Sequence, residues 1–235
     1  MEKQEIYQEL ENDMLDYKDY AAVPVQIIDE PMVSIPTTPN LAAQQLRLEM
    51  LPYTGEKVYV RKSVAERLGH AASFLAEEDS NLQLLVAYGY RALEIQKRNF
   101  EAEKKKLENR YSGEELLAAT HRLIAVPEVA GHPAGAAVDI LITQDGKPLE
   151  FGTNIWEFKP DSYTFSPFIS DEAKCNRQLL RSVMMNAGFA PFNGEWWHFS
   201  YGDKEWAKYY NQPTAMYEQI DFRAESEQGK WGCRG

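Results

Sequence analysis

Two histidines and one aspartate, His132, Asp139 and His198, are the residues of this chain best suited to hold a metal ion. They occur in two short segments, Gly-His-Pro-Ala-Gly-Ala-Ala-Val-Asp and Gly-Glu-Trp-Trp-His, which lie well apart in the chain. Three protein ligands with an open fourth position are the usual arrangement of a catalytic zinc ion. Glu195, in the second segment, would be a free carboxylate beside the site, suited to take a proton from the water that the metal activates. These residue types predict a zinc hydrolase.

Asp139 is stronger evidence for a metal site than its spacing from His132 alone would be. Taken alone, the two could be a loop histidine and a strand-entry aspartate with no shared role. Asp139, however, lies inside the apolar stretch Ala-Val-Asp-Ile-Leu-Ile, where an unpaired carboxylate would cost several kcal/mol of desolvation. Metal coordination would offset that cost, and so would a buried salt bridge.

Glu195 and His198 can reach one site only under a structural condition. Positions three apart in a regular strand point to opposite faces, so a bend must precede the strand. Gly194 permits such a bend, and Trp196 and Trp197 are expected in the core.

The elements that must position these residues alternate between helices and short strands. The predicted strands are residues 57–60, 82–88, 137–143, 149–151 and 197–201. The predicted helices are residues 2–19, one with a capping box at Ser63, one after Arg91, one with a capping box at Ser112, and one from Ser170 to Gly188. Prolines between residues 23 and 52 favour an extended segment that wraps the body. His121 is expected on the surface or in packing contacts rather than at the metal. This order favours an α+β fold with a mostly antiparallel sheet and flanking helices.

Composition and charge exclude some classes of partner. A net charge of -11 argues against a nucleic-acid partner, which would need a basic surface. No apolar run reaches the roughly 18 residues of a spanning helix, so no membrane partner is expected. The acidic start lacks the features of a signal peptide, which predicts a cytoplasmic protein, or a periplasmic one if a leader has been removed. Cys175 and Cys233 are expected to be reduced. The oligomeric state stays open.

Three motifs occur in a characteristic order: Gly-Tyr-Arg ending at Arg91, then His-x-x-Gly-x-Ala-x-Asp, then Glu-x-Trp-His. Together they resemble the motifs of the D-alanyl-D-alanine dipeptidases, the zinc peptidases associated with vancomycin resistance. Relatives of that family are the zinc D,D-carboxypeptidases and L,D-endopeptidases of bacterial walls. The resemblance runs from about Pro31 to Trp206.

The resemblance implies roles for five residues. His132, Asp139 and His198 would bind one zinc ion per chain, Glu195 would be the general base, and Arg91 would steady the oxyanion. A structural salt bridge is the alternative role for Arg91. The implied substrate is a small peptide, D-Ala-D-Ala or a closely related D-amino-acid dipeptide. The alternatives are a D,D-carboxypeptidase or L,D-peptidase acting on cell-wall peptides, and a non-catalytic, metal-stabilised binding protein. Retention of the base and of only three ligands disfavours the last, because a structural zinc normally takes four protein ligands.

Two departures from the family pattern lie on its substrate-binding side. Ala130 stands where the family commonly has Ser, and Trp156 stands where it usually has Asp, with Glu157 next to it. The amine of a dipeptide would then need another anion, since a buried charge requires a partner. Glu157 and Asp161 are the nearest candidates in sequence.

The order of the predicted elements divides the chain into three regions. We expect an N-terminal helical or extended arm over residues 1–22, a single zinc-peptidase domain over residues 23–221, and a loose C-terminal tail over residues 222–235.

Overall fold

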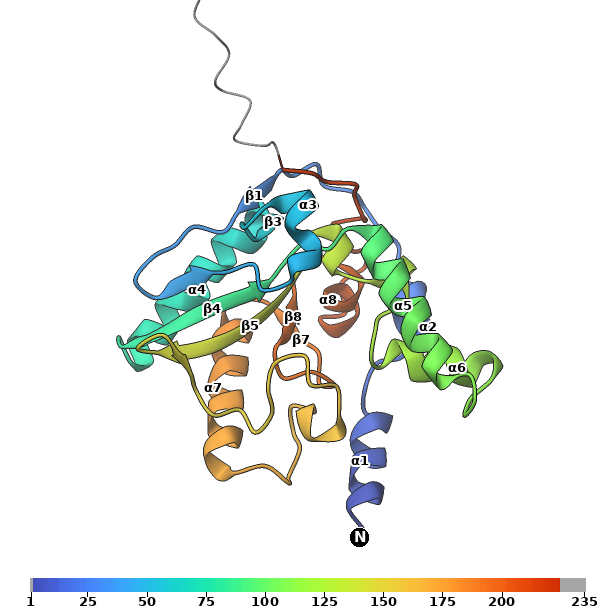
Figure 1. Ribbon diagram of the computed structural model, residues 1–235. Coiled ribbons are helices and arrows are strands. Elements are labelled where there is room, and N and C mark those ends of the chain that lie inside the picture. The colour runs from blue at the N-terminus through green and yellow to red at the C-terminus, as the bar shows by residue number, and fades with distance from the viewer. Residues whose placement is uncertain (1, 225–235) are drawn as a thin grey trace, which may run out of the picture.

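The structure, a computed structural model, describes residues 2–224 and is built on a mixed sheet (Figure 1). In spatial order the strands are β2 (Leu41–Ala43), β4 (Leu82–Tyr88), β5 (Ala137–Gln144), β8 (His198–Ser200) and β7 (Ala190–Pro191), with β6 (Lys147–Pro148) paired to β5. β2 runs parallel to β4, and the other pairings of this sheet are antiparallel. A separate antiparallel pair is formed by β1 (Met32–Ser34) and β3 (Tyr59–Arg61). The predicted α+β fold with a mostly antiparallel sheet is confirmed.

Two long helices, α4 (Lys62–Glu78) and α7 (Asp171–Asn186), pack together and cover one face of the sheet (Figure 1). Leu68 of α4, Leu180 of α7 and Ile140 of β5 are each 0% exposed in this layer. The other helices are α1 (Lys3–Asn12), α2 (Tyr17–Ala21), α3 (Leu51–Thr54), α5 (Leu93–Leu107), α6 (Gly113–His121) and α8 (Lys204–Tyr209). Short 3₁₀ turns lie at η1 (Leu48–Met50), η2 (Pro127–Val129), η3 (His132–Ala134) and η4 (Pro160–Ser162).

Helix α7 and the central strands follow the sequence-based expectation closely. The predicted strand over residues 82–88 is β4, and the one over 137–143 is β5 with one more residue. Helix α7 begins after Ser170, whose hydroxyl accepts the backbone N–H of Ala173. It ends before Gly188, which has a φ of 89°; this left-handed conformation favours glycine.

The capping-box predictions were wrong in their chemistry. Ser63 lies inside α4, and its hydroxyl donates to the carboxylate of Glu30 instead of capping the helix. Ser112 precedes α6 but makes no side-chain cap bond. The predicted strand over residues 57–60 is shifted to Tyr59–Arg61. A capping-box pattern shows that a serine could accept a backbone N–H at the start of a helix. Contacts with other parts of the fold decide which hydrogen bond the serine makes.

The two ends of the chain differ from the expected simple segments. The helix predicted over residues 2–19 is two helices, α1 and α2, and Asp16 caps the second. At the other end the backbone N–H of Phe222 donates to the Tyr90 hydroxyl over 3.0 Å, so the first residues of the expected tail are bound to the body. Residues 225–235 of that tail, with Cys233, lie outside the described residues. The domain boundaries stay predictions.

Two further expectations concern membranes and thiols. Across residues 2–224, no helix is both long enough and apolar enough to span a membrane. Cys175 is a free, exposed thiol.

Candidate active site

His132 is held by the turn that leads into β5. It begins η3, and its Nδ1 lies 2.7 Å from the backbone carbonyl oxygen of Gly89. Because that oxygen can only accept, Nδ1 carries the proton and the Nε2 lone pair is free to bind a metal. Glycine is required at position 89 because a Cβ there would lie 2.6 Å from the carbonyl oxygen of Tyr59 in β3.

Asp139 occupies the middle of the candidate site because strand register places it there. It lies in β5, directly opposite His198 in β8 and Tyr88 in β4. The residue is 2% exposed. Its Oδ1 lies 3.3 Å from His132 Nε2 and 3.1 Å from His198 Nδ1. Its Oδ2 accepts the indole N–H of Trp156 over 2.7 Å, so the side chain has partners at both oxygens.

Glu195 and His198 enter the same cavity because a turn precedes β8, as expected. The backbone N–H of Glu195 donates to the carbonyl oxygen of Phe192, and that of His198 donates to the carbonyl oxygen of Glu195. This tight turn removes the strict strand alternation that would separate the two side chains. Trp196 and Trp197 are buried in the core, as predicted.

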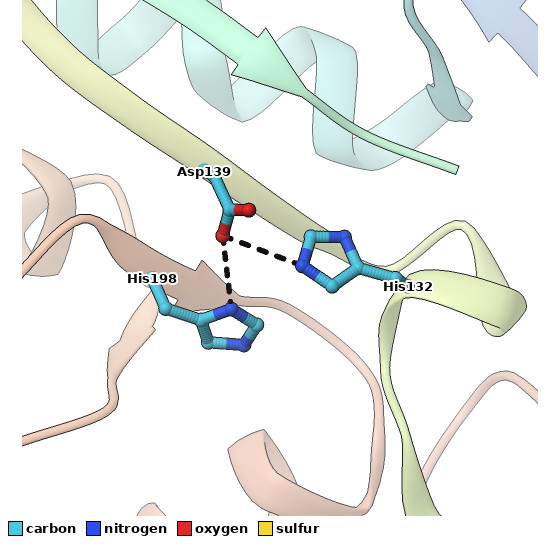
Figure 2. A group of neighbouring side chains, drawn as sticks. All are labelled: His132, Asp139 and His198. Carbon is cyan, nitrogen blue, oxygen red and sulfur yellow. Dashed lines mark hydrogen bonds and ion pairs between the residues drawn. The ribbon is translucent and has the colours of Figure 1, made fainter. Parts of the chain in front are cut away.

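The three side chains fit a zinc ion (Figure 2). Each of His132, Asp139 and His198 offers one ligand atom, and these atoms lie within 4.8 Å of one another. Ligand atoms around a tetrahedral zinc with bonds of about 2.0–2.2 Å are about 3.3–3.5 Å apart, close to the two histidine–aspartate distances. The remaining nitrogen of each imidazole faces an acceptor: the Gly89 carbonyl for His132, and Glu205 Oε2 at 3.7 Å for His198. Such outer partners orient metal-binding histidines.

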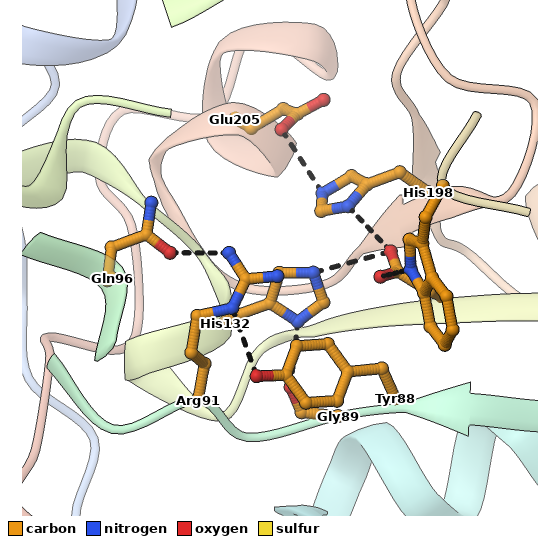
Figure 3. A network of polar contacts seen from close by, with 9 residues as sticks. Tyr88, Gly89, Arg91, Gln96, His132, His198 and Glu205 are labelled. Carbon is orange, nitrogen blue, oxygen red and sulfur yellow. Dashed lines mark hydrogen bonds and ion pairs between the residues drawn. The ribbon is translucent and has the colours of Figure 1, made fainter. Parts of the chain in front are cut away.

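Arg91 enters the same cavity between neutral partners (Figure 3). Its Nη1 donates to Gln96 Oε1 over 2.6 Å and its Nε donates to the Tyr88 hydroxyl over 3.2 Å. Arg91 is 9% exposed and makes no ion pair with a carboxylate among the described residues. The guanidinium is therefore held in place with its charge uncompensated by a contact, as an oxyanion donor should be.

Arg91→Lys is expected to lower kcat/KM at least tenfold. A lysine keeps the positive charge but lacks the planar guanidinium. The guanidinium of Arg91 can donate to Tyr88 and Gln96 and, at the same time, to an oxygen in the cavity. Steady-state kinetics with zinc content measured on the same preparation checks this. Unchanged kcat/KM would assign Arg91 a structural role.

The titratable groups of the site have pKa values that differ widely from one another. Burial raises the pKa of Glu195 to about 7. Burial lowers the pKa of His132 to about 4. Burial also acts against a protonated His198, but Asp139 and Glu205 outweigh it and raise the pKa of His198 to about 9. The facing imidazoles likewise overcome burial at Asp139 and hold its pKa well below the ordinary value. A carboxyl with a pKa near neutrality is suited to acid–base work.

The remaining predicted residues are only partly brought together. Ala130 and Trp156 line the cavity. Glu157 does not: its carboxylate points outward and pairs with Lys159 over 2.6 Å. Asp161 is also outside, hydrogen-bonded to Tyr7 and ion-paired with another arm residue. Neither carboxylate is placed to meet a substrate amine, because each already has its own partners elsewhere.

The sequence interpretation missed several cavity residues, among them a carboxylate and a phenol. Glu205 and Tyr20 line the cavity, although a Lys-Glu pair in a short helix and an aromatic residue in an N-terminal arm give no signal of this. His121 also lines the cavity and is buried rather than on the surface; its Nδ1 accepts the backbone N–H of Val126 over 3.1 Å. Its packing role agrees with the prediction.

Comparison with known proteins identifies the family. Residues 42–220 match the peptidase family described as D-ala-D-ala dipeptidase. The chain belongs to this family. A D-alanyl-D-alanine dipeptidase of Synechocystis sp. is 29% identical to this peptidase over 235 residues, which cover 87% of this chain and 95% of that protein. A D-alanyl-D-alanine dipeptidase of Enterococcus faecium is 29% identical over 87 residues, or 36% of this chain and 43% of that protein.

Solved structures with a similar chain course include two other peptidases. The vancomycin resistance D,D-pentapeptidase VanY is 20% identical with a TM-score of 0.41, covering 83% of this chain and 96% of its own. The L,D-carboxypeptidase LdcB is 21% identical with a TM-score of 0.45, covering 82% of this chain and 81% of its own. The resemblance inferred from the motifs is confirmed by the family match. This protein is a metallopeptidase, and zinc is its cofactor, with the His-Asp-His group as its candidate site.

Proposed function

We propose that this peptidase hydrolyses D-Ala-D-Ala or a closely related D-amino-acid dipeptide. The observation that carries the proposal is one small cavity, of about 60 Å³, into which the candidate zinc ligands, Glu195 and Arg91 all project. The Synechocystis relative, of which 95% is covered by the match, supports the substrate class. His132, Asp139 and His198 are the proposed ligands.

The side chains of the cavity divide the reaction between them. When bound, zinc supplies a Lewis acid that activates water and polarises a carbonyl group. Glu195 accepts a proton from the attacking water and returns it to the nitrogen of the leaving amino acid. Arg91 donates to the carbonyl oxygen as negative charge develops on it, which in other enzymes is worth about 3–4 kcal/mol per donor. Retention of these groups in one cavity disfavours a non-catalytic binding protein.

Recognition of the substrate amine must differ from the family pattern. Trp156 occupies the position where an aspartate is usual, and its indole N–H is engaged by Asp139. The carboxylates that line the cavity within the described chain are Asp139, Glu195 and Glu205. The first two are assigned to the metal and to proton transfer. Glu205, which also faces His198 Nε2 at 3.7 Å, has no assigned part in bond cleavage and is the proposed partner of an ammonium group.

A comparison of free and N-acetylated D-Ala-D-Ala tests the proposed substrate. We expect release of D-Ala from the free dipeptide to be detectable, with weak affinity, and the acetylated form to be the poorer substrate, because Glu205 can pair with a free amine. Values of kcat/KM for the two peptides, measured on zinc-loaded protein, decide the matter. Cleavage of the acetylated peptide alone would make the protein a carboxypeptidase, and cleavage of neither would refute the proposal.

A further inference from the structure

The N-terminal arm, residues 2–22, lies outside the matched family region yet reaches the active site. The family match begins at residue 42. Tyr20, in α2, nevertheless lines the same cavity as His132 and Glu195. It is 3% exposed and packs in a cluster with Phe100, Val126 and Val129. A buried aromatic ring of this kind buries more surface between the arm and the rest of the protein than an exposed contact of the arm does.

Helix α1 ties the arm to the loop that carries the cavity's aromatic residues. The Tyr7 hydroxyl bonds Asp161 and lies 3.1 Å from the Ser166 hydroxyl. Glu11 accepts the Tyr163 hydroxyl over 2.7 Å. These partners belong to residues 152–169, the same loop from which Trp156 and Phe158 line the cavity. Phe158 is 40% exposed, so it lies where the cavity meets solvent.

Other contacts join the arm to the two helices that flank the site. Glu11 also pairs with Arg122 at the end of α6 over 2.7 Å. Asp19 pairs with Lys208 of α8 over 3.2 Å. The elements held in this way supply His121 and Glu205 to the cavity. Exposed ion pairs are individually weak, but together they keep the buried Tyr20 ring against the cavity.

Tyr20 and Glu205 lie beside each other at this wall. Both line the active-site cavity and also a second hollow under the arm. Burial raises the pKa of the Tyr20 phenol, and the nearby Glu205 carboxylate adds to that rise. In a dipeptide the ammonium nitrogen is two bonds from the scissile carbonyl carbon. An ammonium that pairs with Glu205 therefore faces the Tyr20 ring, and a longer peptide would need the space that this ring occupies.

We propose that the N-terminal arm is a specificity-determining wall of the active site, which through Tyr20 excludes peptides extended or acylated at the amino end. The inference rests on the proposed dipeptidase function for its choice of substrates. The wall acts by occupying space and not by chemistry, so it limits the length of the substrate without contributing to bond cleavage.

The test compares Tyr20→Ala with wild type in the full, zinc-loaded chain. The ratio of kcat/KM for N-acetyl-D-Ala-D-Ala to that for D-Ala-D-Ala is expected to rise at least tenfold, with zinc content unchanged. Tyr17→Ala is the matched control, because Tyr17 lies in the same helix and contacts His121 from outside the cavity. Its ratio should stay at the wild-type value. A folded Tyr20→Ala protein with the wild-type ratio would overturn the proposal.

Two additions keep the test decisive. If Tyr20→Ala does not fold, Tyr20→Leu fills the apolar cluster while shortening the side chain, and the same rise in the ratio is expected. Glu195→Gln is also introduced into the wild-type and the Tyr20→Ala proteins. Calorimetry then measures the binding of the two peptides to each protein, which repeats the comparison without turnover. If the wild type cleaves a different dipeptide, the substrate proposal fails. The effect of Tyr20→Ala on the ratio of kcat/KM for the acetylated form of that dipeptide to kcat/KM for its free form still tests the role of the arm.

Discussion

Glu195→Gln is expected to lower kcat for D-Ala-D-Ala by about 10²-fold or more while the protein keeps its zinc. The amide has nearly the same shape as the carboxylate but cannot accept the proton of the attacking water. Among the described residues, the group of side chains that could hold a metal is His132, Asp139 and His198, without Glu195. Zinc content by mass spectrometry and kcat on the same sample separate the two effects. Loss of the metal would make Glu195 a ligand and contradict the mechanism.

The same carboxylate predicts how activity depends on pH. Burial raises the pKa of Glu195 from 4.5 to about 7. A general base works only when deprotonated, so kcat/KM should fall as the pH drops through that pKa. The value of about 7 already includes the opposing effect of the nearby Arg91 charge, so the acid limb should lie near pH 7. The residual activity of Glu195→Gln should lack this limb.

His198→Ala and His132→Ala are each expected to abolish both zinc binding and turnover. Loss of an outer partner of a metal ligand typically costs about 10–100-fold in affinity, and loss of the ligand itself costs more. Wild type should hold about one zinc per chain. The other two histidines provide matched controls, because His70 is exposed and His121 lines the cavity without facing Asp139.

Metal analysis after dialysis gives the outcome directly. His70→Ala and His121→Ala should retain wild-type zinc. Full zinc content in His132→Ala or His198→Ala would sink the assignment of the site, whatever the activity.

The grouping of His132, Asp139 and His198 in one candidate site could be predicted from sequence because its signal is one of residue type. An aspartate within an apolar strand needs a reason to be buried, and the motifs around His132 and His198 supply it. The register that pairs Asp139 with His198 could not be predicted, because pairing between distant strands depends on the whole sheet. The motifs therefore pointed to the candidate ligands, and the fold brings their side chains together.

The substrate side was harder to predict because nearness in sequence does not give the direction of a side chain. Glu157 follows Trp156 directly, yet the indole turns inward to Asp139 and the carboxylate turns outward to Lys159. Trp156 has a φ of 62°, an uncommon conformation for a bulky residue that no sequence pattern indicates. Glu205 was missed because it reaches the cavity from α8, after the last recognised motif.

The pairing of Asp139 with His198 has a consequence for the stability of the sheet. One proposed ligand lies in β5, one in β8 and one in the turn before β5. A metal held by all three is a cross-link between two neighbouring strands that only the native register can form. Because such an ion binds the folded chain and not the unfolded one, it adds to the free energy of unfolding, by about 2.7 kcal/mol when free zinc is at 100 times its Kd. Zinc supply therefore sets the thermodynamic stability of the fold as well as the rate of the reaction.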